Sequence, residues 1–142
     1  MIFDEQNVQV VDSIANWQEA VKLASEPLIA NQSISEKYIT NMIKSVGDNG
    51  PYMVLADYFA LMHARPGEGV NKMSMSLLVT HEAVDLAGKP VKIFLIMAAT
   101  DNASHLESLQ KVMTIFMDQD DFQTILTGKK DKIISILNKM ED

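Results

Sequence analysis

The sequence predicts an α/β fold, a single-domain sandwich in which helices on both faces cover a small mixed β-sheet. Strand-like apolar runs gather in the middle third of the 142 residues, and segments with helical periodicity lie on both sides of them. The connections are too irregular for a regular βαβ alternation, which favours a mixed sheet over a purely parallel one. No repeat, low-complexity tract or linker divides the chain, so we expect one domain over residues 1–142.

Two helices are expected ahead of the main strands. Capping-box patterns, with a Glu three residues after an Asn or Ser, begin at Asn16 and at Ser33. Apolar residues then recur with the three-to-four-residue spacing of a helix that covers a core. They are Trp17, Ala20, Val21, Ala24 and Leu28 in the first helix, and Tyr38, Ile39, Met42, Ile43 and Val46 in the second. We expect the first helix to end near Asn31 and the second in the turn sequence 47–51.

The middle third changes to strand patterns. Short apolar runs bounded by turn signals predict buried strands. We expect them at 53–55, 60–62, 75–80 and 91–98, with a further short strand at 7–11. Asp57 marks a bend between the first two of these, and the Arg-Pro-Gly-Glu-Gly sequence at 65–69 predicts an exposed loop.

The last third is helical. Ser104 begins a third capping-box pattern, which predicts a helix with its apolar stripe on one face. That stripe consists of Leu106, Leu109, Val112, Met113 and Phe116. A short helix is expected at 118–126, and Gly128 separates it from a last helix that carries Ile133 and Leu137.

Composition excludes several classes of protein. The chain has no Cys, which rules out disulfides, thiolate catalysis and cysteine-bound zinc. Its net charge of −7 and its lack of a dense Lys/Arg cluster argue against nucleic acid as a partner. The acidic start lacks the features of a signal peptide, and the longest apolar stretch, 91–99, is too short to span a bilayer. We therefore expect a cytoplasmic protein that does not insert into the membrane itself, although its partner could be membrane-bound.

The three histidines carry most of the functional information. No GxGxxG or P-loop is present, so no nucleotide cofactor is indicated. Imidazole can act as nucleophile and as leaving group near neutral pH. His63 lies where a predicted strand enters a Pro/Gly loop, with Arg65 placed to complement a dianion, and His105 lies in the first turn of a predicted helix. On these facts alone a purely structural role for either histidine stays open, and His81 is assigned no role.

A recognisable pattern runs over nearly the whole chain in four segments, residues 16–22, 50–56, 61–70 and 97–105. Together they resemble the IIA proteins of the bacterial phosphoenolpyruvate-dependent sugar phosphotransferase system, in the mannitol/fructose superfamily and nearest its ascorbate type. The most specific stretch is His63-Ala64-Arg65-Pro66, which matches the family's His-(Gly/Ala)-Arg-Pro. Met62 stands where the family usually has Pro, and Asp57-Tyr58 stands where it usually has Pro-Gly.

The resemblance implies a phosphotransferase that works without a cofactor or a metal. His63 would accept a phosphoryl group through Nε2 from the phosphocarrier protein HPr. It would then pass the group to a IIB component, and so to a membrane IIC permease for sugar uptake. His105 would lie beside it and assist, and Arg65 would pair with phosphate oxygens or with a partner. The mannitol branch also uses an Arg upstream of its active His, but no Arg precedes Arg65 here, so that role is absent or taken by Arg65 or a partner's side chain.

The partner surface and two rival functions complete these expectations. We expect apolar side chains such as Met62 and Met73 at the centre of the interface with HPr. One rival is a regulatory IIA-like protein whose phosphorylation state controls a partner by binding. The other is a zinc enzyme that uses all three histidines, against which stands the absence of HxxxH or HExxH spacing.

Overall fold

The protein is described here from a computed structural model, which covers residues 3–103 and 106–141. Its elements, in chain order, are η1 (Glu5–Asn7), β1 (Val8–Val11), α1 (Trp17–Ala30), α2 (Glu36–Asn49), β2 (Val54–Ala56), β3 (Tyr58–Met62), β4 (Ser74–Leu86), β5 (Lys89–Ala98), α3 (Leu106–Met117), α4 (Gln119–Thr127), α5 (Lys130–Leu137) and η2 (Asn138–Glu141).

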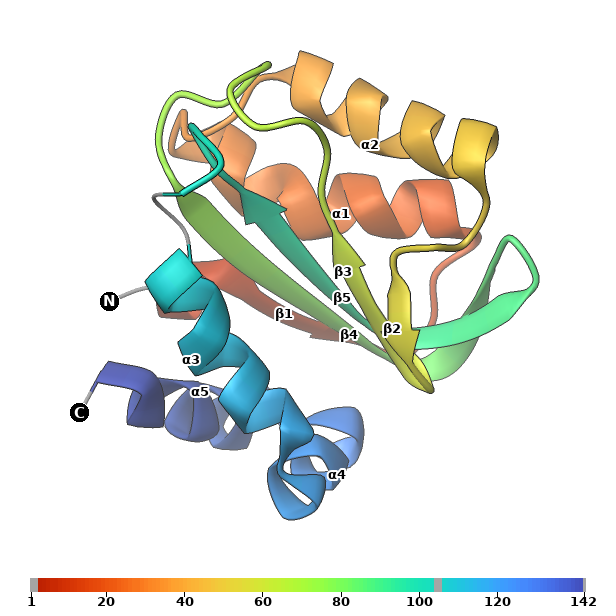
Figure 1. The fold of residues 1–142 in the computed structure, drawn as a ribbon. Helices are drawn as coiled ribbons and strands as arrows, with labels where there is room; N and C mark the ends of the chain where they lie inside the picture. The colour runs from red at the N-terminus through yellow and green to blue at the C-terminus, as the bar shows by residue number, and fades with distance from the viewer. Residues whose placement is uncertain (1–2, 104–105, 142) are drawn as a thin grey trace.

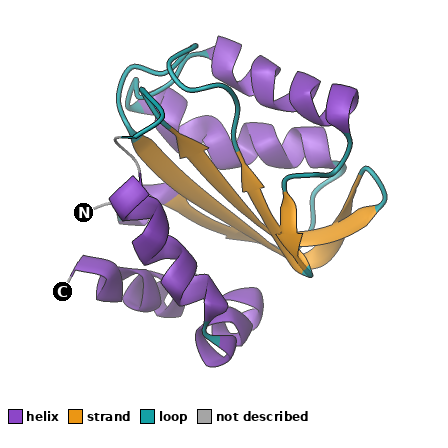
Figure 2. Ribbon diagram, in the orientation of Figure 1, coloured by secondary structure: helices purple, strands orange, loops and turns teal. Residues whose placement is uncertain are grey.

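The strands form one mixed sheet in the order β1-β4-β5-β3-β2. β1 pairs with β4 and β3 with β5 in parallel, whereas β4/β5 and β2/β3 are antiparallel pairs. Helices α1 and α2 cover one face, and α3, α4 and α5 lie on the other (Figure 1). Figure 2 shows the same three layers by element type. The predicted sandwich with a mixed sheet is therefore confirmed.

Alternation along the central strand β5 divides the core into two halves. Ile93 and Leu95 belong to the cluster under α3 to α5, whereas Phe94 and Ile96 belong to the cluster under α1 and α2. Successive side chains of a strand point to opposite faces, so a strand covered on both faces is apolar at every position. All four of these side chains are completely buried.

The first predicted helix start is confirmed and the second is wrong. The Asn16 side chain accepts the Glu19 backbone N–H at 2.9 Å, as the first half of a capping box requires. Ser33 does not cap α2, because its hydroxyl donates to Asn31 Oδ1 at 2.5 Å and its carbonyl accepts the Asn71 N–H at 2.8 Å. The helix begins at Glu36 after Ser35, whose side chain makes no capping bond.

The predicted ends of the first two helices are confirmed, whereas one strand is longer than predicted and one helix start lies outside the described residues. α1 continues through Pro27 to Ala30, and α2 continues through Gly47 to Asn49 before Gly50, at φ 78°, ends it. β4 extends to Leu86, where Ala87 and Gly88, both with positive φ, form a tight hairpin into β5. Ser104 and His105, on which the third capping box rests, lie outside the described residues.

Candidate functional site

His63 follows the last residue of β3, at the carboxyl ends of the parallel pair β3/β5. Open α/β sheets bind ligands at this edge of parallel strands. The His63 Nδ1 lies 2.9 Å from the Leu61 carbonyl oxygen. A carbonyl oxygen only accepts, so Nδ1 carries the ring proton. In the neutral ring this leaves the lone pair on Nε2, the nitrogen that a nucleophilic histidine uses for attack.

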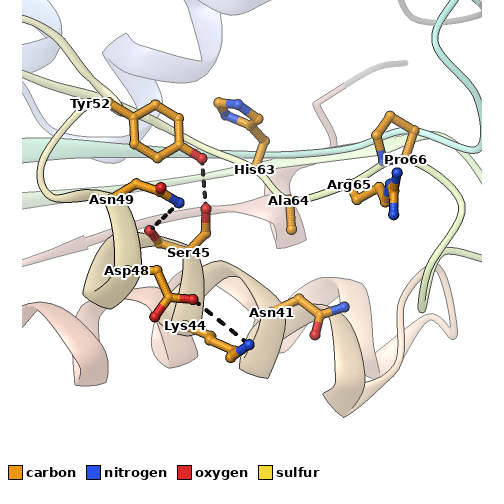
Figure 3. A pocket seen from close by; sticks show the side chains of 10 residues that line it. All are labelled: Asn41, Lys44, Ser45, Asp48, Asn49, Tyr52, His63, Ala64, Arg65 and Pro66. Carbon is orange, nitrogen blue, oxygen red and sulfur yellow. Dashed lines mark hydrogen bonds and ion pairs between the residues drawn. The ribbon is translucent and has the colours of Figure 1, made fainter.

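A cleft of about 380 Å³ opens beside this histidine. One wall is a stripe of polar side chains along α2. The other wall is formed by a residue that precedes β2 and by residues that follow β3 (Figure 3). The lining residues are Asn41, Lys44, Ser45, Asp48 and Asn49 from the helix, and Tyr52, His63, Ala64, Arg65 and Pro66 opposite. Positions i, i+3, i+4, i+7 and i+8 share one side of a helix, which is how α2 turns five polar side chains into the cleft.

Tyr52 packs against the His63 ring. The two rings meet edge to face, with centroids 6.0 Å apart and planes at 87°. The Tyr52 hydroxyl is hydrogen-bonded to the Ser45 hydroxyl at 2.7 Å, which fixes the tyrosine to α2 (Figure 3). Tyr52 nevertheless stays 47% exposed, so the ring is accessible from solvent at the mouth of the cleft.

Several donors in the cleft are available to an anion. Arg65 is exposed, and within the described residues its guanidinium has no ion-pair partner. Lys44 pairs with Asp48 at 3.7 Å, but both side chains are well exposed, so the pair is weak and easily exchanged. The Asn41 Nδ2 is buried without a hydrogen-bond partner in the described part of the chain. An unpaired buried donor is costly, so it favours a ligand that brings an acceptor.

The predicted site residues have different outcomes. His63 and Arg65 line one cleft, in which Arg65 lies beside Pro66 and apart from the His63 ring (Figure 3). His105 lies outside the described residues, so its assisting role stays a prediction. His81 is an exposed residue of β4 whose Nδ1 lies 2.9 Å from Asp12 Oδ1. The described residues contain no group of three or more His, Cys, Asp or Glu that could hold a metal ion.

The expectation for the partner surface is wrong at Met62. This side chain is completely buried in the cluster under α1 and α2, because it points inward at the end of β3. Met73 is partly buried and packs against the opposite cluster. The exposed large apolar side chain that lines the cleft is instead Tyr52, at 47%.

The sequence prediction missed the whole α2 wall of the cleft. The signal was present, since Asn41, Lys44 and Ser45 alternate with the apolar stripe of the same helix. A polar stripe on an amphipathic helix normally faces solvent, however, and only the fold shows that this one faces His63.

Among the described residues, no helix combines the length and apolar character that crossing a membrane requires.

Comparison with known proteins gives the following matches. Over residues 1–140 the chain matches the family described as "Phosphoenolpyruvate-dependent sugar phosphotransferase system, EIIA 2". The mannitol-specific cryptic phosphotransferase enzyme IIA component of Escherichia coli K12 is 33% identical over 132 residues, or 92% of this chain and 90% of that protein. The ascorbate-specific PTS system EIIA component of the same strain is 29% identical over 126 residues, 86% of this chain and 82% of that protein.

Solved structures give the same picture. The solution structure of the mannitol-specific cryptic IIA protein CmtB from Escherichia coli superposes with a TM-score of 0.90 and 30% identity, over 97% of this chain and 96% of that one. The enzyme IIA of the mannitol system, solved in complex with phosphorylated enzyme IIB from Escherichia coli, superposes with a TM-score of 0.82 over 96% of this chain and 97% of that one. At 17% identity the second match supports the fold alone.

Proposed function

The chain belongs to the EIIA 2 family of the phosphoenolpyruvate-dependent sugar phosphotransferase system, and we propose that it carries the phosphoryl group on Nε2 of His63. A phosphotransfer role in sugar uptake follows from the family. The choice of atom rests on one observation, the 2.9 Å contact between His63 Nδ1 and the Leu61 carbonyl, which leaves Nε2 with the lone pair. The match over residues 1–140 supports a single IIA domain spanning residues 1–142.

The transfer step uses the His63 ring as nucleophile and then as leaving group. The Nε2 lone pair attacks the phosphorus of phospho-HPr as the donor's P–N bond breaks, and the donor nitrogen keeps that electron pair. The phosphorylated His63 ring retains its Nδ1 proton and becomes cationic, and the Leu61 carbonyl stabilises that charge. In the second step a nucleophile of the IIB component attacks the phosphorus, and His63 regains its lone pair.

The cleft supplies donors for the phosphoryl oxygens. Phosphoryl transfer depends on in-line positioning and electrostatic stabilisation more than on covalent assistance. Asn41 Nδ2 offers an unused N–H, and Lys44 offers a positive charge on the α2 wall, where the chain has no arginine. Exposed Arg65 is free to meet the incoming phosphate or an acidic side chain of a partner. By the family resemblance, His105 adds a second imidazole.

The partners and location proposed for this chain follow the family. We propose that it works in the cytoplasm between HPr and a IIB component, and through IIB supports a membrane IIC permease. A IIA–IIB complex has been solved for the mannitol system, whose IIA protein shares this fold. Tyr52, about half exposed and in contact with the His63 ring, gives the proposed partner surface an apolar side chain at the mouth of the cleft.

Incubation with enzyme I, HPr and phosphoenolpyruvate tests the acceptor. The wild type should take up one acid-labile phosphate, and His63→Ala should fold and take up none. His81→Ala is the matched control, because His81 is a histidine outside the cleft, and it should label like the wild type. Stoichiometric labelling of His63→Ala would exclude His63 as the carrier.

A further inference from the structure

Tyr38 lies directly beneath the His63 segment. It belongs to α2, is 1% exposed, and packs in the cluster under α1 and α2. Most side chains of that cluster are apolar, so a phenol hydroxyl there must find partners. It finds two, and both are backbone groups at the carboxyl ends of β3 and β5.

The two hydrogen bonds join three elements at one atom. The Tyr38 hydroxyl donates to the Met97 carbonyl at 2.5 Å and accepts the Ala64 N–H at 3.0 Å. The last directly paired residues of β3 and β5 are Met62 and Ile96. The hydroxyl therefore bridges the two strands just beyond their last pair, where the chain of β3 leaves the sheet.

The backbone around His63 is thus held on both sides. On the amino side, the ring itself bonds the Leu61 carbonyl, and on the carboxyl side the Ala64 N–H bonds Tyr38. Further along the same loop, Gly69 comes so close to α2 that an added Cβ would lie 2.8 Å from the Tyr38 backbone nitrogen. The Gly69 carbonyl also accepts the Ser35 N–H at 2.9 Å.

We propose that Tyr38 is a positioning residue, whose hydroxyl holds the backbone at Ala64 so that His63 keeps its Nδ1–H tautomer and directs Nε2 into the cleft. This inference rests on the proposed role of His63. Without the hydroxyl, the Ala64 N–H and the Met97 carbonyl would bond each other directly or take up water. Either change moves the turn that sets the contact between the His63 ring and Leu61. Tyr38 itself touches no reacting atom.

Tyr38→Phe removes the hydroxyl and keeps the ring in the core. The matched control is Ser76→Ala, which removes another buried hydroxyl that donates to a backbone carbonyl, that of Ala24 at 2.6 Å, away from His63. The first readout is the tautomer of neutral His63, measured from the ¹⁵N chemical shifts of the two ring nitrogens. The second is the rate of phosphoryl transfer from phospho-HPr, beside the melting temperature of each variant.

We expect the Nδ1–H tautomer to dominate in the wild type and in Ser76→Ala, and to fall to a mixture in Tyr38→Phe. Transfer should slow about tenfold in Tyr38→Phe and change less than about twofold in Ser76→Ala, even where both lose similar stability. An unchanged tautomer, or equal slowing in both variants, would overturn the proposal. If His63 is not the carrier, the tautomer measurement still tests whether Tyr38 positions the His63 ring, because it needs no phosphate.

A third measurement covers the case in which Tyr38→Phe does not fold. In the wild type, hydrogen exchange of the Ala64 amide should be slow, because its N–H is bonded to a buried hydroxyl. The Gly67 amide lies in the same loop as Ala64, and its N–H donates to the Ala99 carbonyl at 2.9 Å. It is the internal reference for a hydrogen-bonded loop amide. Exchange of Ala64 at the rate of an unprotected loop amide would overturn the proposal.

Discussion

Replacing Tyr58 by glycine and by alanine tests whether the backbone is strained at the start of β3, the strand that ends directly before His63. Tyr58 has a φ of 68°, and this left-handed region costs an L-residue about 1–2 kcal/mol. In ordinary extended backbone, glycine is instead about 0.5–1 kcal/mol less favourable than alanine, because its unfolded chain has more freedom. Subtracting the second effect from the first, we expect Tyr58→Gly to be about 0.5–1 kcal/mol more stable than Tyr58→Ala.

Comparing the two variants isolates the backbone effect. Both lose the same ring, including its contact with the Lys92 ammonium 5.1 Å from the ring centroid. Urea denaturation gives the two free energies of unfolding. Leu55 in β2 is the matched control: it is 51% exposed and has no positive φ, so Leu55→Ala should be more stable than Leu55→Gly. A Tyr58→Ala variant as stable as Tyr58→Gly, or more so, would refute the reasoning.

Four further expectations can be checked with the same phosphoryl-transfer and unfolding assays. Arg65→Ala should slow transfer about tenfold at an unchanged melting temperature, and an unchanged rate would leave Arg65 as loop surface only. His105→Ala should accept phosphate but pass it to IIB about 100-fold more slowly, since a lost donor often costs about 3 kcal/mol; a wild-type rate would remove His105 from the site. Asn16→Ala should lose about 1 kcal/mol of unfolding free energy with its cap, and an unchanged urea midpoint would contradict that cap. Burial raises the pKa of Tyr38 from 10.0 to about 12, so the folded state holds a proton that the unfolded state releases; stability present below pH 10 should fall as the pH rises towards 12, and Tyr38→Phe should lack that decline.

The elements of the fold could be predicted largely because local patterns decide them. Asn16 caps α1 through a residue only three positions away. The apolar run of β5 indicated a strand, and burial on both faces explains why residues 93–98 are all apolar. The capping box at Ser33 failed for a long-range reason. Ile34 forms an isolated bridge with Val70, and this bridge keeps the chain extended for two residues beyond the predicted helix start.

The site could be predicted only in part, for a related reason. His63 and Arg65 are found from the sequence because the strand end and the Pro/Gly loop are adjacent in the chain. The α2 wall requires knowing that a helix about twenty residues earlier packs over that strand end. The Asp57-Tyr58 departure from the family's Pro-Gly also becomes clear only in the structure. Tyr58 has a φ of 68°, in the left-handed region that favours glycine, so the start of β3 has a backbone conformation that suits a glycine at this position.

Helix α2 links the stability of the core to the chemistry of the site. Its apolar side buries Tyr38, Met42 and Val46 against the sheet, and its neighbouring polar side presents Asn41 and Ser45 to the cleft. Successive residues of a helix are about 100° apart, so one rotation of α2 determines both contacts. A shift of the buried side would therefore move the cleft wall, and on the proposed role of Tyr38 it would reach the backbone beside His63 through the hydrogen bond to Ala64. Substitutions in the core under α2 should therefore change transfer rates, although the side chains that they alter never meet the phosphate.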